Sequence, residues 1–511
     1  MSFRLALLLA FAPGFPPAPA SSAQPGKPIR ITILHTNDIH GWIMPRAAAF
    51  YKRNPRRLIG GAAALAAYAK KIKGPKLVLD AGDWFLGTPE GSLERGRAMA
   101  GVLNSVGYDA LEAGNHEFDY GEKSLSELIK ALHAPVLCAN VYRAEGRRAP
   151  ECRPWIVKEV SGVKVGVFGL LTPYMKGRTA PENIAGLSFR RPSDEAKDDV
   201  AALRKEGATV IIALTHLGFE SPDGPPLEGD QTLASEVAGI DLIVGGHSHT
   251  ALQKPVRDAA YGTLITQAGA YLTRVGVATL EIDAATKKVL RSSDRLVDLW
   301  LDETGEDPAT AKAVAGLSEE VKRRYDVVVA TAQASLSRNR DGESPLGDWM
   351  TDCERAWTGV DLAILNGGGI RGDIEKGPVT MRRIHDAAPF DNHVVTLVMK
   401  GKDLRSLLDH GVGLGAVAQV SGAKLSFHRG APAGKRLKAV SIGGRALVDG
   451  STYTVASVDY LVHGGDGYAA FKSAESENFT KTSLQEVLKW CALKQARIEA
   501  PPAGRLLPLG N

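Results

Sequence analysis

The sequence of 511 residues has no low-complexity tract and no dense run of lysine or arginine. Its formal net charge at pH 7 is only +5, and we predict that the one local basic cluster, at 52–57, is a solvated loop. A mild, scattered charge does not indicate binding to a nucleic-acid polymer or to an anionic membrane surface. We therefore expect neither among the partners of this protein.

A membrane-spanning apolar run is also missing from the N-terminus. Arg4 precedes a short apolar stretch that is too short to span a bilayer comfortably, and small residues follow it. This order is typical of a secretory signal peptide, which we predict over 1–23 with cleavage after Ala20 or Ala23. The cleavage site offers no cysteine for a lipid, and the tail 500–511 has no hydrophobic anchor. The expected protein is exported, periplasmic or secreted, and has no membrane anchor.

Cysteine is scarce, with four residues in the chain, and none stands in a CxxC or Cys/His spacing that would indicate a zinc ribbon. An even count in an oxidising compartment permits two disulfides. Cys138 with Cys152 would close a short local loop, and Cys353 with Cys491 is the remaining pair. Four buried thiols are the alternative, because connectivity cannot be deduced from sequence.

The chain has instead a repeated local pattern in its first half. Continuous apolar runs lie at 30–34, 76–79, 109–113, 209–214 and 240–244. Helix-like segments such as 60–73 separate them, so we predict buried strands of an α/β fold. A chain of this length exceeds one ordinary core, and two domains are expected.

Each apolar run ends at glycine or at a polar residue that could bind a metal. A single Asp or His after a strand is usually a cap or turn residue, but five strand ends in succession are not explained that way. Loops at the carboxyl ends of strands in open α/β sheets converge on one crevice, so we expect these groups to meet. The set is Asp38, His40, Asp83, Asn115, His216, His247 and His249.

Seven oxygen and imidazole ligands are too many for one tetrahedral zinc ion. Asp38 with His40, and His247 with His249, are spaced i and i+2, which points both members of a pair to one side in an extended segment. The set suits two ions about 3.5–4 Å apart that share one carboxylate. Because no thiolate is present, Zn, Mn, Co, Mg and Fe are all chemically admissible.

The motifs TNDIHG, AGDWF, GNHEFDYG, THLG and GGHSHT, in that order, resemble the metallophosphoesterase domain of the secreted 5′-nucleotidase family. That family includes periplasmic UDP-sugar hydrolase/5′-nucleotidase, ecto-5′-nucleotidase and 2′,3′-cyclic-nucleotide 2′-phosphodiesterase. The resemblance covers nearly the whole mature chain. It implies a four-layer α/β/β/α metallophosphoesterase domain over 28–305, a linker helix over 306–326, and a second α/β substrate-binding domain for nucleotide specificity over 327–511.

The resemblance also implies how the ligands divide. The first ion would be held by Asp38, His40 and His249, and the second by Asn115, His216 and His247, with Asp83 bridging both. Some family members have Gln or Asn at the position of His249, and a His there would only tune the first site.

His116 and Asp119 match the family's catalytic pair. A hydroxide generated at the ions can attack phosphorus in line without a protein base, because bound metal lowers the pKa of water. A cationic imidazole can then stabilise or protonate the leaving oxygen, and a carboxylate three residues later can orient it and raise its pKa. We assign Glu117 and His35 supporting or packing roles.

The second half carries a glycine triplet after the apolar run 360–365, and taken alone this is weak evidence for a phosphate site. Phe390 and Tyr460 alone would be core residues by default. By resemblance they stack on the nucleobase, a contact worth about 1–3 kcal/mol per base. Tyr460 replaces the more usual Phe but keeps a stacking face. The other implied substrate contacts are Asn366, Gly368, Arg371, Asp466 and one of Arg338 and Arg340.

The resulting prediction is an exported metal-dependent hydrolase of nucleotide phosphate esters. Its substrate would be a nucleoside 5′-monophosphate or a UDP-sugar, and its two domains would have to approach each other for catalysis. The alternative is a 2′,3′-cyclic-nucleotide 2′-phosphodiesterase with 3′-nucleotidase activity, which would have the same dinuclear site. A thiosulfohydrolase shares the architecture, but the stacking pair and Arg371 argue against it. A solute-binding protein would need no such ligand set. The sequence does not specify the oligomeric state.

Overall fold

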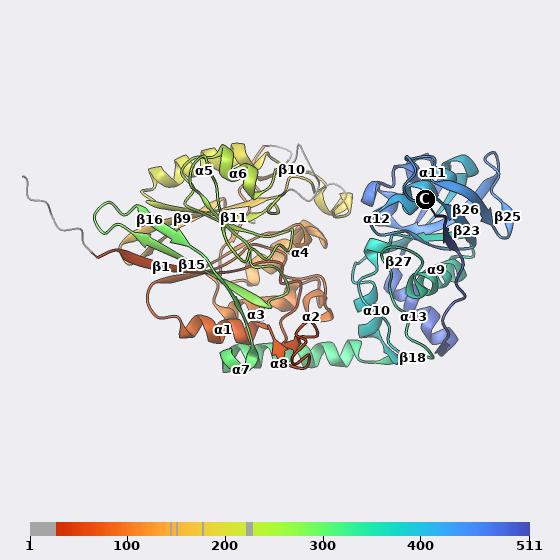
Figure 1. Ribbon diagram of the computed structural model, residues 1–511, viewed down its shortest axis with the longest axis horizontal. Coiled ribbons are helices and arrows are strands. Elements are labelled where there is room, and N and C mark those ends of the chain that lie inside the picture. The colour runs from red at the N-terminus through yellow and green to blue at the C-terminus, as the bar shows by residue number, and fades with distance from the viewer. Residues whose placement is uncertain (1–26, 144–145, 150–151, 176–177, 221–227, 511) are drawn as a thin grey trace, which may run out of the picture.

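The computed structural model describes residues 27–143, 146–149, 152–175, 178–220 and 228–510. The predicted signal peptide, 1–23, lies outside these residues. The described chain forms two lobes, and helix α8 (Pro308–Tyr325) runs along one side of the N-terminal lobe and ends beside the C-terminal lobe (Figure 1). Within the described part of the chain, no helix is both long enough and apolar enough to cross a membrane.

The N-terminal lobe contains two large sheets. In spatial order, the first consists of β16 (Val289–Ser293), β15 (Arg274–Ile282), β1 (Ile29–Thr36), β4 (Lys76–Asp80), β5 (Ala110–Glu112) and β6 (Val136–Leu137), with β17 (Leu296–Asp298) beside β15. The second consists of β13 (Val256–Arg257), β14 (Leu264–Thr266), β12 (Leu242–Gly245), β11 (Val210–His216), β9 (Val163–Leu171) and β8 (Trp155–Val160).

Three apolar clusters make this lobe a four-layer structure. Ile33 of the first sheet and Val165 of the second belong to a buried cluster between the two sheets. Helices α1 (Ala62–Lys71) and α3 (Ala100–Val106) pack on the outer face of the first sheet. Helices α5 (Pro192–Lys205) and α6 (Asp230–Glu236) pack on the outer face of the second. The predicted α/β/β/α fold is confirmed, and burial of both faces explains the continuous apolar strands.

The five predicted strands are present but are divided between the sheets. β1, β4 and β5 are parallel neighbours in the first sheet, and β11 and β12 are parallel neighbours in the second. The sequence gives no indication of this division, because a strand buried on both faces looks the same in either sheet. The polar residues that follow both sets of strands nevertheless meet at one edge of the sandwich.

Helix α8 lies within the range 306–326 expected for a linker helix. Asp307 caps its first turn by accepting a hydrogen bond from the backbone N–H of Thr310 at 3.0 Å. Val314, Leu317 and Val321 then pack into the core of the N-terminal lobe. The connecting helix is therefore anchored to the first lobe over much of its length.

The C-terminal lobe is built around a five-stranded sheet. In spatial order its strands are β22 (Gln419–Ser421), β19 (Leu362–Leu365), β26 (Thr452–Val458), β21 (His393–Lys400) and β27 (Ser476–Ser483). Two smaller sheets contain β20 (Gly377–Thr380), β18 (Val328–Ala332) and β28 (Arg497–Ile498), and β25 (Arg445–Ala446), β24 (Leu437–Ile442), β23 (Ala423–Phe427) and β29 (Leu506–Pro508). The helices are α9 (Pro345–Thr358), α10 (Met381–Ala387), α11 (Gly401–Gly413), α12 (Asp459–Val462) and α13 (Leu484–Gln495).

Both predicted disulfide pairs are confirmed. Cys138 and Cys152 close a local loop in the N-terminal lobe, with a sequence separation of 14. Cys353 of α9 and Cys491 of α13 join two helices of the C-terminal lobe across a separation of 138. Closing the longer loop restricts the unfolded chain more, which in the chain-entropy description makes it the stronger cross-link.

Candidate functional site

One group of possible metal ligands combines residues that follow β1 and β12. The ligand atoms of Asp38, His40 and His249 lie within 4.8 Å of one another. The Nε2 atom of His249 is 3.3 Å from Asp38 Oδ1 and 3.1 Å from His40 Nε2. Burial would raise the pKa of the Asp38 carboxyl, but the imidazoles of His249 and His216 hold it below its usual value. A charged carboxylate with imidazoles around it is a donor set that suits a divalent cation.

A second group lies beside the first. The ligand atoms of Asp83, His216 and His247 also lie within 4.8 Å of one another. His216 Nε2 is 3.1 Å from Asp83 Oδ2 without forming a hydrogen bond. Asn115 adjoins this group because the backbone N–H of its neighbour His116 donates to Asp83 Oδ1 at 3.0 Å.

Three buried ligand atoms at this second group have no hydrogen-bond partner: Asn115 Oδ1, His216 Nε2 and His247 Nε2. An unsatisfied buried polar atom costs about 1–3 kcal/mol, so three in one place need an explanation. All three are atoms that coordinate divalent cations, and a bound ion would satisfy them together. The residues present therefore fit the two-ion centre that the ligand set predicts.

Backbone carbonyls orient two of the imidazoles. His40 Nδ1 is 2.8 Å from the carbonyl of Leu86, and His216 Nδ1 is 2.7 Å from the carbonyl of Ala81. Because a carbonyl can only accept, each Nδ1 carries the proton and each Nε2 is left facing the carboxylates. Ligating histidines in proteins are commonly fixed by this arrangement.

The backbone is strained at the same residues. Five of the seven predicted ligands have positive φ angles: Asp38, His40, Asp83, His247 and His249, with values between 49° and 77°. Such conformations cost a non-glycine residue about 1–3 kcal/mol and persist where the surrounding structure holds them. Their concentration here is typical of a functional site.

His116 and Asp119 are in direct contact. His116 Nδ1 is 2.5 Å from Asp119 Oδ2, and the imidazole also lies in a group with His40 and Asp83. Burial would lower the pKa of His116, but the carboxylates of Asp119 and Asp83 raise it to about 9. The two carboxylates therefore favour the cationic form of this imidazole next to the candidate ion positions.

Glu117 and His35 are buried outside the ion groups. Glu117 accepts hydrogen bonds from the backbone N–H groups of Asp83 at 2.8 Å, Trp84 at 2.8 Å and Gly114 at 2.6 Å, which joins the loops after β4 and β5. His35 Nε2 lies 3.2 Å from Asp294 Oδ1, and both side chains are fully buried. Both observations agree with the supporting or packing roles predicted for these residues.

The predicted substrate contacts of the C-terminal lobe gather around Asp466. Its carboxylate accepts hydrogen bonds from Asn366 Nδ2 at 2.6 Å and from the Tyr460 hydroxyl at 2.9 Å. Gly368 is close enough that an added Cβ would lie 3.5 Å from the side chains of Asn366 and Asp466. The structure thus links Tyr460 to Asp466.

The carboxylate of Asp466 acts on the pKa of Arg371, so Arg371 is near this cluster. Its guanidinium is 5.2 Å from the centre of the Phe390 ring. Burial lowers the pKa of Arg371, and the charges of Arg340 and Arg338 add to that shift. Both candidate arginines therefore lie within electrostatic reach of Arg371, and Arg338 donates a hydrogen bond to the Arg371 carbonyl.

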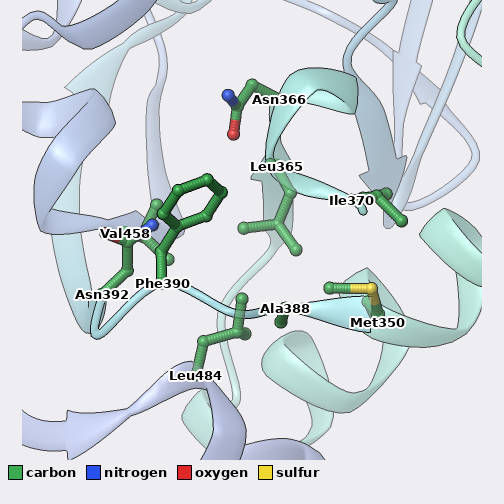
Figure 2. A pocket seen from close by; sticks show the side chains of 10 residues that line it. Met350, Leu365, Asn366, Ile370, Ala388, Phe390, Asn392, Val458 and Leu484 are labelled. Atoms are coloured by element: carbon green, nitrogen blue, oxygen red, sulfur yellow. The ribbon is translucent and has the colours of Figure 1, made fainter. Parts of the chain in front are cut away.

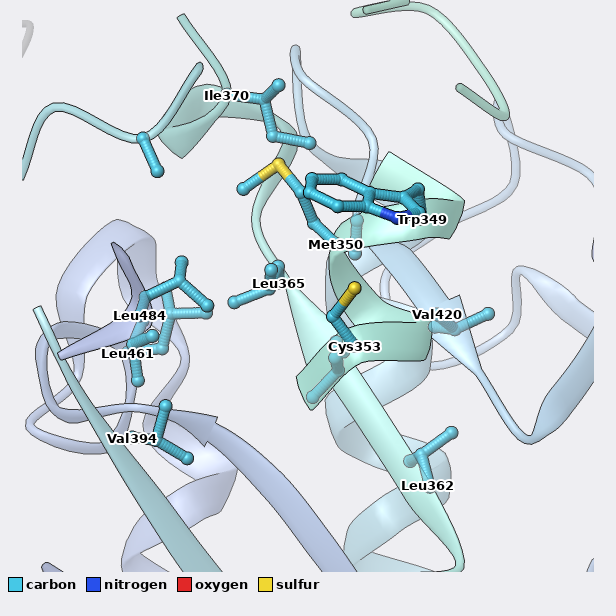
Figure 3. Packing of buried hydrophobic residues seen from close by; sticks show 14 of the residues in the cluster. Trp349, Met350, Cys353, Leu362, Leu365, Ile370, Val394, Val420, Leu461 and Leu484 are labelled. Carbon is cyan, nitrogen blue, oxygen red and sulfur yellow. The ribbon is translucent and has the colours of Figure 1, made fainter. Parts of the chain in front are cut away.

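Phe390 lines an apolar pocket at the surface of the C-terminal core. Its ring and the amide of Asn366 face the same space (Figure 2). Met350, Leu365, Ile370 and Leu484 line the pocket and also belong to the core of this lobe (Figure 3). The ring contacts of Phe390 are to His116 of the other lobe, at 6.3 Å, and to Arg371. Tyr460 is not among the residues that line this pocket.

Asn392 is a pocket residue that the sequence analysis did not select. It lies two positions after Phe390 and lines the same pocket (Figure 2). An amide beside an aromatic ring can hydrogen-bond the edge of a planar ligand that stacks on the ring. The sequence around Phe390 does not indicate which of its polar neighbours, Asp391 or Asn392, faces the pocket.

Comparison with known proteins identifies the family. Residues 31–251 match the family model of the calcineurin-like phosphoesterases, and residues 322–473 match that of the 5′-nucleotidase C-terminal domain. The protein UshA of Yersinia enterocolitica is 30% identical over 97% of this chain and 96% of its own length. The chain belongs to the 5′-nucleotidase family.

Two further similarities agree with membership of the 5′-nucleotidase family. A 5′-nucleotidase of Vibrio cholerae is 30% identical over 95% of this chain and 94% of its own length. The crystal structure of a 5′-nucleotidase precursor from Thermus thermophilus, 29% identical, matches with a TM-score of 0.80 over 94% of this chain and 100% of that one. The protein is a metallophosphoesterase and hydrolyses phosphoric esters. Divalent metal ions belong to this chemistry, and the Asp and His groups described above could hold them.

Proposed function

We propose that this protein is an exported 5′-nucleotidase that cleaves nucleoside 5′-monophosphates and, as further substrates, UDP-sugars. One observation carries the proposal: the charged His116 adjoins both candidate ion groups and stacks on Phe390 of the other lobe. A nucleotide phosphate ester has a planar base and a charged phosphate group. In this arrangement Phe390 can stack on the base while the nearby His116 cation faces the phosphate.

In this proposal one ion would be held by Asp38, His40 and His249 and a second by Asn115, His216 and His247, and Asp83 would contribute to both groups. When bound, two divalent ions supply an activated water as nucleophile and neutralise charge on the phosphoryl oxygens. His116 protonates the leaving oxygen, and Asp119 keeps its imidazole charged and oriented. The ions themselves are Zn, Mn, Co or Mg.

The C-terminal lobe selects the nucleotide. Phe390 and Tyr460 stack on the base, and Asn366, Gly368 and Asp466 contact the nucleoside. Arg371, with Arg338 and Arg340, binds phosphate, because the planar guanidinium forms two parallel hydrogen bonds to it. In this proposal residues 28–305 form the domain with the metal centre, 306–326 form the linker, and 327–511 form the domain that determines nucleotide specificity.

Export is supported by the signal-peptide pattern at 1–23 and by both disulfides. Disulfides form and persist mainly in oxidising compartments such as the periplasm or the cell exterior. Cys138–Cys152 and Cys353–Cys491 use all four cysteines of the chain. The measurement for this part is the N-terminal sequence of the protein recovered from the producing cell, which should begin after Ala20 or Ala23.

A substrate panel tests the activity. Metal-reconstituted protein would be assayed with AMP, UDP-glucose, 2′,3′-cyclic AMP, 3′-AMP and bis-p-nitrophenyl phosphate. We expect AMP to have the highest kcat/KM. Turnover of only the cyclic substrate or the model diester would reject the proposal in favour of a cyclic-nucleotide phosphodiesterase. Phe390→Ala serves as a further probe, since it should raise KM for AMP by removing the ring on which the base stacks.

A further inference from the structure

Tyr271 borders the first group of candidate ligands, although no motif in the sequence marks it. It lies between β14 and β15, and its backbone N–H donates to the Asp38 carbonyl at 2.8 Å. The centre of its ring is 5.8 Å from that of His40 and 5.4 Å from that of His249. Two of the three residues of this group therefore pack against one phenol ring.

The position of Tyr271 is held by backbone and side-chain contacts. Its φ angle is 63° and that of Leu272 is 51°, so two consecutive non-glycine residues are left-handed. Arg46 donates a hydrogen bond from Nη1 to the Tyr271 carbonyl at 3.0 Å, and its guanidinium lies 4.3 Å from the centre of the Trp42 ring. The strain is thus balanced by contacts that fix the ring beside the candidate ligands His40 and His249.

The other end of Tyr271 is open. The residue is 36% exposed, a large value for an aromatic side chain at such a site. Its backbone N–H and carbonyl are both hydrogen-bonded, whereas its hydroxyl has no partner among the described residues. Burial raises the pKa of this phenol, and the positive charge of Arg371 is the largest influence that opposes the rise. The phenol of one lobe and the guanidinium of the other are therefore electrostatic neighbours.

These contacts define two walls over the metal centre. On one side His116 lies 5.3 Å from His40 and 6.3 Å from Phe390, measured between ring centres. On the other side Tyr271 adjoins His40 and is the neighbour of Arg371. Each wall combines one residue from each lobe. In the second wall, Tyr271 and Arg371 can both donate hydrogen bonds, and only the phenol oxygen can also accept one. This wall therefore suits an anion.

We propose that the Tyr271 hydroxyl donates a hydrogen bond to the phosphoryl group next to the one that reacts, which makes Tyr271 a residue that favours diphosphate over monophosphate substrates at this site. The inference rests on the proposed function, since it concerns substrates of the same site. The reacting phosphoryl group lies among the ion ligands and His116, so a second phosphoryl group needs donors farther out. Tyr271 and Arg371 offer hydrogen-bond donors from opposite lobes.

The test compares monophosphate with diphosphate substrates in Tyr271→Phe, which keeps the ring packed on His40 and His249 and removes only the hydroxyl. We expect kcat/KM for ADP and UDP-glucose to fall about tenfold, the loss of one hydrogen bond to a charged group, while AMP changes less than about twofold. Tyr261→Phe is the matched control, because this tyrosine of the same lobe is 52% exposed and away from the site. An equal loss for AMP and ADP, or no loss for ADP, would overturn the inference.

A binding measurement separates this inference from the proposed function. Titration of metal-loaded protein with methylene diphosphonate, and separately with inorganic phosphate, involves no nucleotide and no turnover. Tyr271→Phe should weaken diphosphonate binding about tenfold and phosphate binding less than about twofold. Unchanged diphosphonate affinity, or a fall in bound metal that shows Tyr271 merely supports the ligands, would overturn it. If the wild type cleaved no nucleotide, the proposed function would be wrong. The binding affinities of the wild type and Tyr271→Phe for methylene diphosphonate would still test the role of Tyr271.

Discussion

His116 is in contact with both lobes of the molecule. Its imidazole lies 5.3 Å from His40 in the N-terminal lobe and 6.3 Å from Phe390 in the C-terminal lobe, between ring centres. Its Nδ1 atom is engaged by Asp119, which leaves Nε2 available for a ligand. This geometry separates the residue from Asn115, its neighbour in sequence, whose Oδ1 is buried without a partner.

His116→Asn should remove catalysis and leave the metal centre intact. We expect kcat for AMP to fall by about 10²–10⁴, the usual contribution of a general acid. Bound metal, measured by elemental analysis, should stay at the wild-type level. His133→Asn, on the exposed surface of the same lobe, is the control. A loss of metal in His116→Asn would make His116 a ligand and contradict the assignment.

Asp119→Asn should change the pH dependence of the reaction. The carboxylate of Asp119 is the main charge that raises the pKa of His116 to about 9 against the effect of burial. The cationic imidazole is present below that pKa and is lost as pH rises through it. Without the carboxylate the pKa falls, so the alkaline limb of the kcat profile should move to lower pH. Bound ions lower the pKa of His116 in the wild type and in Asp119→Asn alike, so the difference between their kcat profiles still reports the effect of the Asp119 carboxylate. An alkaline limb at the wild-type position would contradict this role of Asp119.

At the scale of elements, the site depends on the close approach of two loops. Gly114, which follows β5, lies so near the loop after β4 that an added Cβ would be 2.2 Å from Asp83 Oδ1 and 2.6 Å from its backbone nitrogen. Glu117 accepts hydrogen bonds from the backbone of both loops. The motif GNHEFDYG therefore begins with Gly114 because a larger residue at this position would clash with the Asp83 carboxylate.

Gly114→Ala should weaken metal binding although it removes no ligand. The new methyl group must displace Asp83, and we expect metal affinity to fall about 10–100-fold, as when a supporting residue of a metal site is lost. Titration of the metal-free protein with Mn²⁺ measures this. Gly101→Ala in α3 is the matched control, since a Cβ there meets no atom within 4 Å. Equal Mn²⁺ affinity in the Gly114 and Gly101 variants would show that the loops adapt.

The sequence was sufficient for the strands and for the order of the ligands, because both are local patterns. The run before Asp83 became β4, and the run before His216 became β11. The pairing of these strands into separate sheets was not predictable, since it depends on contacts distant in sequence. Tyr271 and Asn392 were missed for the same reason: each is made functional by residues of another segment. The anchoring of α8 on the first lobe likewise appears only in three dimensions.

At the scale of the whole molecule, an ion cluster joins the lobes beside the end of α8. Arg382 of α10 lies 2.7 Å from Glu90, which belongs to α2 (Pro89–Ser92) of the N-terminal lobe, and 2.6 Å from Asp326 just beyond α8. The Glu90 side chain is only 3% exposed. Any rotation of one lobe against the other must either keep this contact as a pivot or expose the carboxylate.

Arg382→Leu should therefore destabilise the arrangement of the lobes. Removing one partner of a buried ion pair costs about 3–5 kcal/mol, because the other partner, here the Glu90 carboxylate, is left unpaired. We expect a lower thermal unfolding temperature than in Arg383→Leu, which changes the exposed neighbour. Adding Glu90→Gln should restore part of the loss, since it removes the unpaired carboxylate. No recovery in the double variant would show that Glu90 does not depend on Arg382.

The proposed function requires two metal ions, which Asp38, Asp83, Asn115 and the histidines around them would hold, for hydrolysis of a nucleotide phosphate ester. The most direct measurement follows AMP hydrolysis and bound metal in the same sample, first after removal of metal by EDTA and then during titration with Mn²⁺, Co²⁺ or Zn²⁺. We expect no turnover in the metal-free protein and full activity at two ions per chain. Turnover that persists without metal, or activity complete at one ion per chain, would contradict it.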